Sequence, residues 1–389
     1  MSDPTAEVPS TTPGELQDRI DRGEPVRVLD LRNRDEVERW SLTGPSVTLT
    51  QRPYNRFIQA RVTDSVDAFV DDIAGEGPIT VVCARGEASA DVARHLVDAG
   101  YDAHNLAGGM AAWARLLRRV ELDAASDGAT VVQYRRPASG CLGYAVVAGG
   151  EMAVVDPLRA FVDRYAADAR GRGAEIRWVI DTHVHADHVS GLRGLADAAG
   201  ATPVMSAPAV DRGVTFDVET VTDGDELQVG EATLEAVHAP GHTTGMTAVA
   251  VGDALLSGDS LFVGSVARPD LERGADGARD LAEELYRTLT ERFARFADDT
   301  VVAPGHHAAD PALADDGGHT ATLGALRDLP AFDMTRAAFV DYVTGDMGPR
   351  PANFETVIDV NLGRETVDET TAFELELGPN NCAATPVEQ

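Results

Sequence analysis

The run His183-Val184-His185-Ala186-Asp187-His188 constrains this chain more than any other stretch of its sequence. It follows residues 176–180, whose apolar and β-branched composition predicts a buried strand. Directly after such a strand, three imidazoles and a carboxylate on one tight turn can converge on a cation while the strand holds them rigid. The sequence therefore predicts a metal centre at the end of this strand.

Further ligands must come from other loops, and three positions qualify. His242, Asp259 and His306 each follow or end a later strand candidate. Because the functional groups of an α/β sheet collect at the ends of its strands, we expect these side chains to join the histidine run. Capping and surface histidines are the alternative interpretation, and the density of this cluster argues against it.

The length and the patterning predict two domains. A chain of 389 residues exceeds one ordinary core. Strand-like and helix-like pieces alternate over residues 12–118, which predicts an α/β domain with a parallel sheet. Residues 129–389 begin with successive strand candidates, and Gly149-Gly150 is a hairpin signal between two of them. We place the boundary near residue 122, in a charged stretch that also contains Gly and Ser.

Cys83 lies where an apolar strand candidate ends and a helical stretch begins. The loop from Cys83 to Ser89 can curl so that backbone N–H groups point at the sulfur, and the following helix N-terminus would lower the pKa of the thiol. Such a thiolate can accept sulfane sulfur. A small buried apolar residue is the alternative role for a lone cysteine.

The Cys83 loop resembles the Cys-X-X-Gly-X-X-Ser active loop of rhodanese sulfurtransferases. Residues 28–32 upstream, and residues 106–110 with Trp113 downstream, support the resemblance. It implies a rhodanese-like α/β domain with Cys83 as the catalytic residue and Arg85 as a substrate-binding residue. An inactive, structural rhodanese-like domain stays open as the alternative.

The histidine run, with the downstream His242, Asp259 and His306, resembles the metallo-β-lactamase superfamily, whose fold is an αββα sandwich. Two branches compete: thiolester hydrolases of the glyoxalase II type, with two metals, and persulfide dioxygenases, with one iron. Residues 264–271 look like the Gly-Arg-Pro-Asp-Leu segment of bacterial persulfide dioxygenases, with Ala267 in place of the usual glycine. Residues 350–354 and 361–363 are also similar to the tail of that branch.

The resemblance to the dioxygenases implies one Fe(II) per chain, held by His183, His242 and Asp259. Two histidines and one carboxylate leave open positions on Fe(II) for a persulfide sulfur and dioxygen. Arg268 would face the anionic substrate or, as an alternative, pair with Asp270. The remaining ligand positions of the superfamily would orient ligands and water, or hold a second metal in a hydrolase: His185, Asp187, His188 and His306.

The combined resemblance implies a persulfide dioxygenase that oxidises a low-molecular-weight thiol persulfide to sulfite with O2, coupled to rhodanese-type sulfur transfer. A two-zinc thiolester hydrolase of the glyoxalase II type, with a passenger rhodanese-like domain, is the alternative. A third hypothesis is a non-catalytic sulfur carrier or sensor, but the complete ligand set argues against a degenerate metal domain.

The charge balance bears on partners and location. Lys and Arg total 33 against 64 Asp and Glu, and the net charge of −31 disfavours nucleic acid and anionic membranes as partners. Because the acidic excess is spread along the chain, it suits a halophilic surface on which salt screens self-repulsion. Neither a signal peptide nor an apolar run of membrane-spanning length is visible, so we expect a cytoplasmic protein. Assembly into a homo-oligomer is compatible with this composition.

The three cysteines lie far apart in the sequence, which makes a disulfide framework improbable. Cys141 opens a strand candidate, and we expect a packed thiol there, with a place beside the metal pocket as the alternative. Cys382 lies near the end of the chain, and its sequence context predicts no mechanism.

Overall fold

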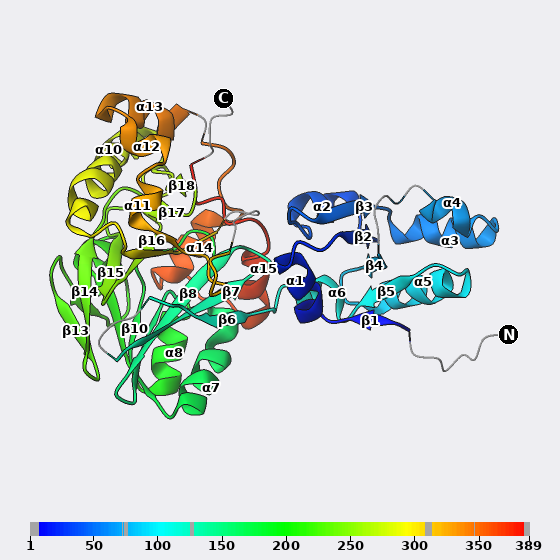
Figure 1. Cartoon of the computed structure of the whole chain (residues 1–389), viewed down its shortest axis with the longest axis horizontal. Helices are drawn as coiled ribbons and strands as arrows, with labels where there is room; N and C mark the ends of the chain where they lie inside the picture. The colour runs from blue at the N-terminus through cyan, green and yellow to red at the C-terminus, as the bar shows by residue number, and fades with distance from the viewer. Residues whose placement is uncertain are drawn as a thin grey trace. The chain divides into compact units, whose positions relative to one another are not determined.

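The computed structural model describes residues 8–71, 73, 77–124, 128–307, 313–345 and 347–384. The chain divides into two compact units (Figure 1). The first runs to Leu116 and includes the short segment Arg136–Ser139, and the second consists of Leu117–Arg135 and the chain from Gly140 onward.

The first unit is built on one parallel sheet with strand order β1-β5-β4-β2-β3. Its central strand β4 is buried at every position, as expected for a parallel sheet covered on both faces. The strands are β1 (Ser10–Thr11), β2 (Val26–Asp30), β3 (Val47–Gln51), β4 (Ile79–Val82) and β5 (Ala103–Leu106). The helices are α1 (Pro13–Asp21), α2 (Arg34–Arg39), α3 (Tyr54–Val62), α4 (Val66–Val70), α5 (Glu87–Asp98) and α6 (Gly109–Trp113).

The second unit is a sandwich of two sheets. The first sheet has the strand order β12-β11-β10-β9-β8-β7-β6, and the second has the order β13-β14-β15-β16-β19-β20. The strands of the first sheet are β6 (Arg118–Glu121), β7 (Thr130–Arg136), β8 (Cys141–Ala148), β9 (Glu151–Val155), β10 (Glu175–Ile180), β11 (Thr202–Ser206) and β12 (Glu219–Val221). Those of the second are β13 (Glu226–Val229), β14 (Ala232–His238), β15 (Thr247–Val251), β16 (Ala254–Gly258), β19 (Val301–Pro304) and β20 (Ala321–Thr322). A small separate hairpin joins β17 (Leu261–Phe262) to β18 (Ser265–Val266).

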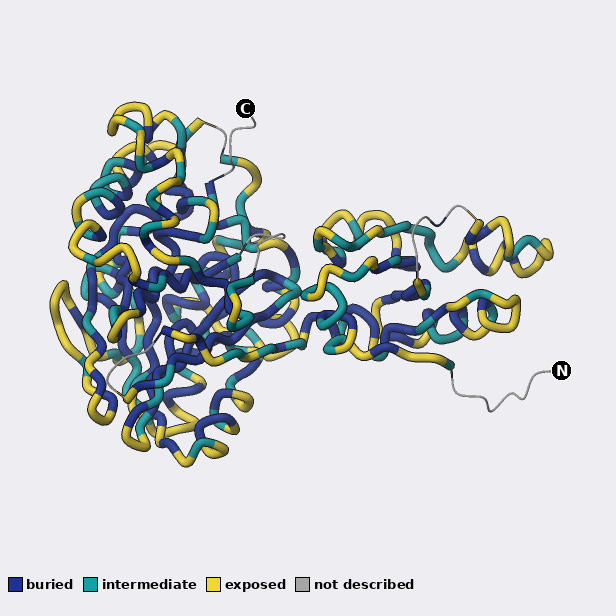
Figure 2. Tube along the Cα trace, viewed as in Figure 1, coloured by how far each residue is buried: buried dark blue, intermediate teal, exposed yellow. Residues whose placement is uncertain are grey.

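Helices cover both outer faces of this sandwich. The inner faces of the sheets share one core, in which Val146 of β8 packs with Leu234 of β14, whereas its neighbour Ala145 belongs to the cluster under α7 and α8. This alternation along a strand produces the predicted αββα layers. The helices are α7 (Val162–Arg172), α8 (Leu192–Ala199), α9 (Ala207–Val210), α10 (Gly274–Arg287), α11 (Leu323–Leu326), α12 (Pro330–Asp333), α13 (Arg336–Gly345), α14 (Phe354–Asn361) and α15 (Glu369–Leu375). Figure 2 shows the buried strands in the centre of the unit and the exposed loops around them.

The start of the second unit differs from the sequence-based expectation. Strand β6 pairs antiparallel with β7, so the second sheet system begins at Arg118, before the predicted boundary. Farther along this unit, α10 ends at Arg287, and a π-helical turn follows over Thr288–Arg292. There the Thr288 hydroxyl donates a 2.7 Å hydrogen bond to the carbonyl of Pro240, two residues before His242.

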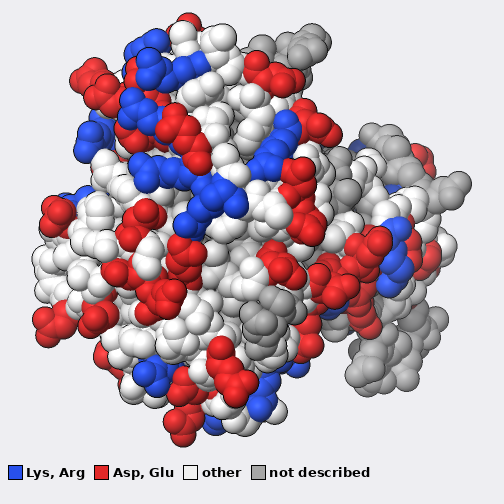
Figure 3. Space-filling view, turned by 60° about the vertical axis from the view of Figure 1, so that its left-hand side comes forward, with Lys and Arg blue, Asp and Glu red and all other residues white. Residues whose placement is uncertain are grey.

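The surface carries both acidic and basic side chains. In the space-filling view of Figure 3 acidic side chains are spread over the visible face, and basic side chains gather mainly in its upper part. Over the described part of the chain, every helix is too short or too polar to cross a membrane.

Candidate metal centre and cysteine loop

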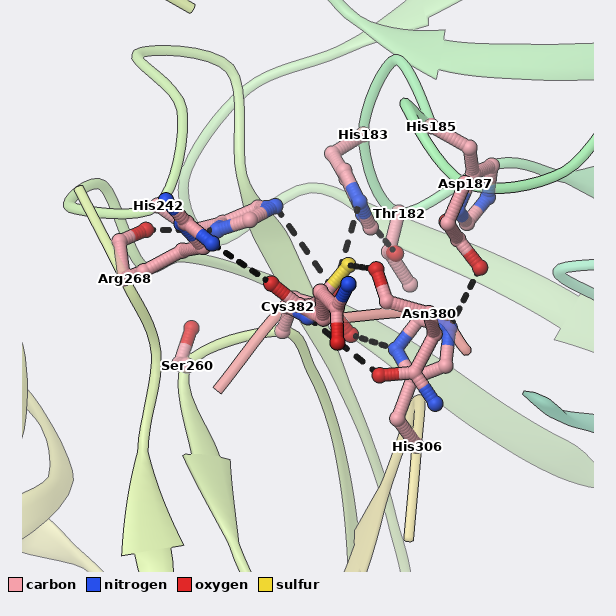
Figure 4. Close-up of polar contacts among 12 residues, drawn as sticks. Thr182, His183, His185, Asp187, His242, Ser260, Arg268, His306, Asn380 and Cys382 are labelled. Atoms are coloured by element: carbon pink, nitrogen blue, oxygen red, sulfur yellow. Dashed lines mark hydrogen bonds and ion pairs between the residues drawn. The ribbon is translucent and has the colours of Figure 1, made fainter. Parts of the chain in front are cut away.

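The sequence-predicted metal ligands all lie on loops at the ends of strands. The histidine run, residues 183–188, occupies the loop between β10 and α8. His242 follows β14, Asp259 follows β16 directly, and His306 follows β19. Both sheets thus bring candidate ligands to one place, and Figure 4 shows His183, His242 and His306 turned toward one another.

Three of these side chains point unpartnered atoms at one another. The Nε2 atoms of His183 and His242 lie 3.8 and 3.6 Å from Oδ2 of Asp259, and all three side chains are at most 1% exposed. None of these atoms has a hydrogen-bond partner. Because a buried polar atom without a partner is costly, this trio is better suited to a bound cation than to an empty site.

The neighbours of the trio fix which nitrogen faces inward. Nδ1 of His242 lies 2.8 Å from the Arg268 carbonyl, which can only accept, so Nδ1 carries the proton. Nδ1 of His183 donates to the Thr182 hydroxyl at 2.9 Å, since that hydroxyl donates in turn to Asp156. Both Nε2 atoms therefore carry free lone pairs, as metal ligation by histidine requires.

The protonation states also suit a cation. Burial lowers the pKa of His183 and His242, so both imidazoles are neutral at neutral pH. Burial alone would raise the pKa of the Asp259 carboxyl, but the charge and the hydrogen bond of His306, together with the two other histidines, lower it below its ordinary value. Two neutral imidazoles and one carboxylate are thus ready to bind a divalent metal.

A second group of buried donors adjoins the trio. Cys141, Asp187, His188 and His306 each offer a ligand atom, and these atoms lie within 4.8 Å of one another. Nδ1 of His306 lies 2.7 Å from Asp259 and its Nε2 lies 2.8 Å from Asp187. Burial opposes the charged form of His306, but the two carboxylates outweigh it and raise its pKa. The His306 ring therefore bridges two carboxylates.

His185 is held away from the trio. Its Nε2 lies 3.1 Å from Oδ1 of Asp156, a residue with positive φ directly after β9. The same carboxylate accepts hydrogen bonds from the backbone and the hydroxyl of Thr182. Asp156 therefore supports two neighbouring positions of the loop, while Nδ1 of His185 is buried without a partner.

Cys382 is the residue that sequence reasoning missed. It is fully buried, and its sulfur lies within 4.8 Å of ligand atoms of Asp259 and His306 (Figure 4). The chain end is fixed there because the Cys382 carbonyl accepts from the Arg268 N–H at 3.0 Å and the Ala384 N–H donates to Val266. Burial, followed by the nearby carboxylates, raises the pKa of this thiol, so it is neutral. The Cys141 thiol is packed, as expected. It also donates a hydrogen bond to Asp187 at 3.2 Å, which puts it beside the candidate metal pocket, the alternative place.

The contacts of Arg268 favour the ion-pair alternative. The side chain is 2% exposed, and its guanidinium pairs with Asp270 at 2.6 Å. Its remaining N–H groups donate to the carbonyls of Gly348, Pro349 and Asn381. The ion pair of the alternative interpretation is thus present, substrate binding by Arg268 stays a prediction, and the guanidinium ties Gly348, Pro349 and Asn381 to the loop that carries the His242 acceptor.

The loop at Cys83 has the curl that the sequence predicts. The N–H groups of Gly86 and Ser89 lie 3.1 and 3.4 Å from the sulfur, and the Ser89 hydroxyl lies 3.1 Å from it. Gly86 has a φ of 89° and immediately precedes α5, so the loop needs a glycine there. The two backbone N–H groups can also donate to an anion attached to the sulfur, whereas the Ser89 hydroxyl donates to Asn105 at 2.7 Å. Arg85 is exposed on the same loop.

Family models match both units. Residues 136–306 match the model of the metallo-beta-lactamase superfamily, and residues 12–116 match that of the rhodanese-like domain. The second unit thus carries a metallo-β-lactamase domain, and the first is a rhodanese-like domain. Both resemblances inferred from the motifs are thereby confirmed.

Individual relatives come from both competing branches. A hydroxyacylglutathione hydrolase of Polaromonas sp. is 35% identical over 40% of this chain, and the match spans 57% of that protein, less than two thirds. The human protein "Persulfide dioxygenase ETHE1, mitochondrial" is 26% identical over 54% of this chain and 78% of its own length.

Solved structures agree with the fold. The crystal structure of ETHE1 from Myxococcus xanthus matches with a TM-score of 0.53 and 26% identity, covering 60% of this chain and 97% of that one. A metallo-beta-lactamase from Staphylococcus aureus matches with a TM-score of 0.56 and 26% identity, covering 62% and 76%.

Proposed function

We propose that this protein is a non-haem iron persulfide dioxygenase that oxidises a low-molecular-weight thiol persulfide to sulfite, coupled to sulfur transfer by its rhodanese-like domain. The observation that carries the proposal is the trio of unpartnered atoms on His183, His242 and Asp259. Two neutral histidines and one carboxylate are the ligand set of non-haem Fe(II) oxygenases. Similarity to the persulfide dioxygenases supports the choice of branch.

A single Fe(II) held by the trio would supply open coordination positions for the persulfide sulfur and dioxygen. In the overall reaction one persulfide, one O2 and one water give one free thiol, one sulfite and two protons, and the persulfide loses the four electrons that dioxygen gains. The protein orients the ligands: the Arg268 carbonyl fixes the His242 ring, and His306 holds the second oxygen of Asp259.

The surroundings of the trio limit access of water. His183, His242 and Asp259 are buried, and the neutral thiol of Cys382 adjoins them from the chain end. Low access of water strengthens electrostatic interactions with a bound anion and limits side reactions.

In the rhodanese-like unit, Cys83 would carry the sulfur. Its thiolate attacks the outer sulfur of a donor, a new S–S bond forms, and the remainder of the donor leaves as an anion. The N–H groups of Gly86 and Ser89 stabilise the negative charge on the persulfide that remains on Cys83.

Metal analysis combined with oxygen consumption tests the main proposal. We expect one iron per chain, and oxygen uptake equal to sulfite formed when a small-thiol persulfide is supplied. Two zinc ions per chain, hydrolysis of a thiolester and absence of oxygen uptake would refute it.

The alternative, a two-zinc thiolester hydrolase, is favoured by one observation: Oδ1 of Asp187 and Nε2 of His188 are also buried without partners. A second metal there would need Nε2 of His306, which now bonds Asp187. Because the chain is also similar to hydroxyacylglutathione hydrolases, the experiment above includes zinc content and thiolester hydrolysis.

The two units can be tested separately through Cys83→Ser. Sulfur transfer from thiosulfate should be abolished because the attacking sulfur is gone. Oxygen uptake with a supplied persulfide should remain largely intact, and so serves as the internal control. Survival of both activities would mean that the loop is not a sulfur carrier.

A further inference from the structure

The loop that carries the histidine run leaves buried backbone groups to be satisfied. Residues 181–191 form no helix or extended strand, and nearly all of them are buried. Their N–H and C=O groups therefore need partners outside the ladder of the sheet. Two carbonyls of this loop, those of His185 and His188, find the same side chain.

That side chain is Asn361. Its Nδ2 donates to the carbonyl of His185 at 3.0 Å and to that of His188 at 2.9 Å. Its Oδ1 accepts from the N–H of Ser190 at 2.8 Å. One carboxamide thus binds three points of the loop and uses both donors and its acceptor.

Asn361 is itself firmly held. It is the last residue of α14 and is 6% exposed. Val360 beside it packs against Val189 of the loop and Ala372 of α15, and its carbonyl accepts from Arg193 at 2.9 Å. This support comes from the chain beyond residue 306, where the match to the superfamily model ends.

We propose that Asn361 is a positioning residue of the metal centre, which sets the spacing of the His185 and His188 backbone and thereby the orientation of the histidine rings. The ring centroids of His183 and His185 lie 4.2 Å apart, and those of His185 and His188 lie 4.1 Å apart. Because the rings are in contact, a shift of the loop reaches His183, a ligand of the proposed centre. The inference rests on that metal site, but not on which reaction the site performs.

The substitution Asn361→Asp isolates the two donated hydrogen bonds. It keeps the size of the side chain and an oxygen for Ser190, but it sets a second oxygen against two carbonyls. Asn353→Asp is the matched control, since Asn353 is the N-cap of the same helix and donates one hydrogen bond to the Leu375 carbonyl, away from the loop.

The experiment is titration of the metal-free, full-length protein with Co(II), followed by its d–d absorption spectrum, with thermal unfolding of the metal-free protein alongside. Loss of a group that orients metal ligands typically weakens metal affinity by about 10- to 100-fold. We expect a weakening of this order and an altered spectrum for Asn361→Asp, and wild-type behaviour for Asn353→Asp.

A purely structural role for Asn361 gives a different result. In that case the melting temperature falls while the Co(II) affinity and spectrum stay as in the wild type, and the proposal is wrong. Equal weakening by Asn353→Asp also overturns it, because the effect would then belong to the whole helix. If Asn361→Asp does not fold, Asn361→Ser, which retains one donor, is judged by the same criteria. Since Co(II) binding needs neither persulfide nor oxygen, failure here is distinguishable from failure of the dioxygenase proposal.

Discussion

Arg268→Met tests whether the cluster behind the His242 loop is a closed structural ion pair. The guanidinium of Arg268 makes a bidentate contact with Asp270, with distances of 2.6 and 3.1 Å. Methionine has a similar length and no charge, so it removes the cation while keeping most of the packing volume. The carboxylate of Asp270 then stays buried with a single remaining partner, Arg350, at 2.9 Å.

The expected loss follows from this arrangement. Removing one partner of a buried ion pair costs about 3–5 kcal/mol. Arg350 is partly exposed and still compensates part of the charge of Asp270, so we expect the lower end of that range. For a unit of this size about 3 kcal/mol corresponds to a fall in melting temperature of roughly 6 °C or more.

Calorimetry on the full-length protein is the assay, read on the transition of the second unit. Arg279→Met is the matched control, because its contact with Asp341 has both partners exposed and should contribute less than about 1 kcal/mol. The double variant Arg268→Met/Asp270→Leu should recover part of the loss, since it leaves no unpaired charge.

Two results would refute this reasoning. A loss no larger than that of Arg279→Met means that the cluster is not the closed pair described. Unchanged stability with a raised KM for the persulfide means that Arg268 faces the substrate after all.

Three further predictions concern other parts of the molecule. In Gly109→Ala the new Cβ would collide with the Cys83 carbonyl oxygen and the Gly86 nitrogen. Sulfur transfer from thiosulfate should therefore fall steeply while oxygen uptake persists. Sulfur transfer at the wild-type rate would contradict the loop geometry. Although burial alone would raise the pKa of Asp270, hydrogen bonds from Arg268 and Arg350 lower it. The stability that Asp270 contributes is present above the unfolded-state pKa of about 4 and is lost as the pH falls through the lower folded value. Asp270→Asn should therefore flatten acid unfolding below about pH 4, as checked by urea midpoints. With a net charge of −31, the melting temperature should rise with KCl concentration, and a salt-independent value would remove the halophilic interpretation.

The sequence predicts which side chains gather at the candidate metal centre because each of them follows a recognisable local pattern. Each of the main positions follows an apolar strand candidate, and the topology of the sandwich brings those strand ends together. Cys382 and Asn361 have no such local signal. Their places depend on pairing with residues 266–268 and on contacts with the histidine loop, both of which are remote in sequence.

The domain boundary was misplaced for a different physical reason. Strand β6 reads Arg-Arg-Val-Glu and alternates between intermediate and exposed positions. It is the edge strand of its sheet, and edge strands carry charges that discourage pairing with other chains. A charged edge strand is therefore indistinguishable by composition from a linker.

The donors outside the trio show why a complete ligand set does not reveal how many metals a site holds. His306 bonds Oδ1 of Asp259 with one nitrogen and Asp187 with the other, while Oδ2 of Asp259 faces His183 and His242. Removal of His306 would leave two carboxylates buried without their shared cation, and this costs stability whether or not a second metal ever binds. A one-metal enzyme therefore has a structural reason to retain every residue of a two-metal site. It follows that one metal per chain is compatible with a complete set of ligand residues, and the iron and zinc content of the purified protein decides between one metal and two.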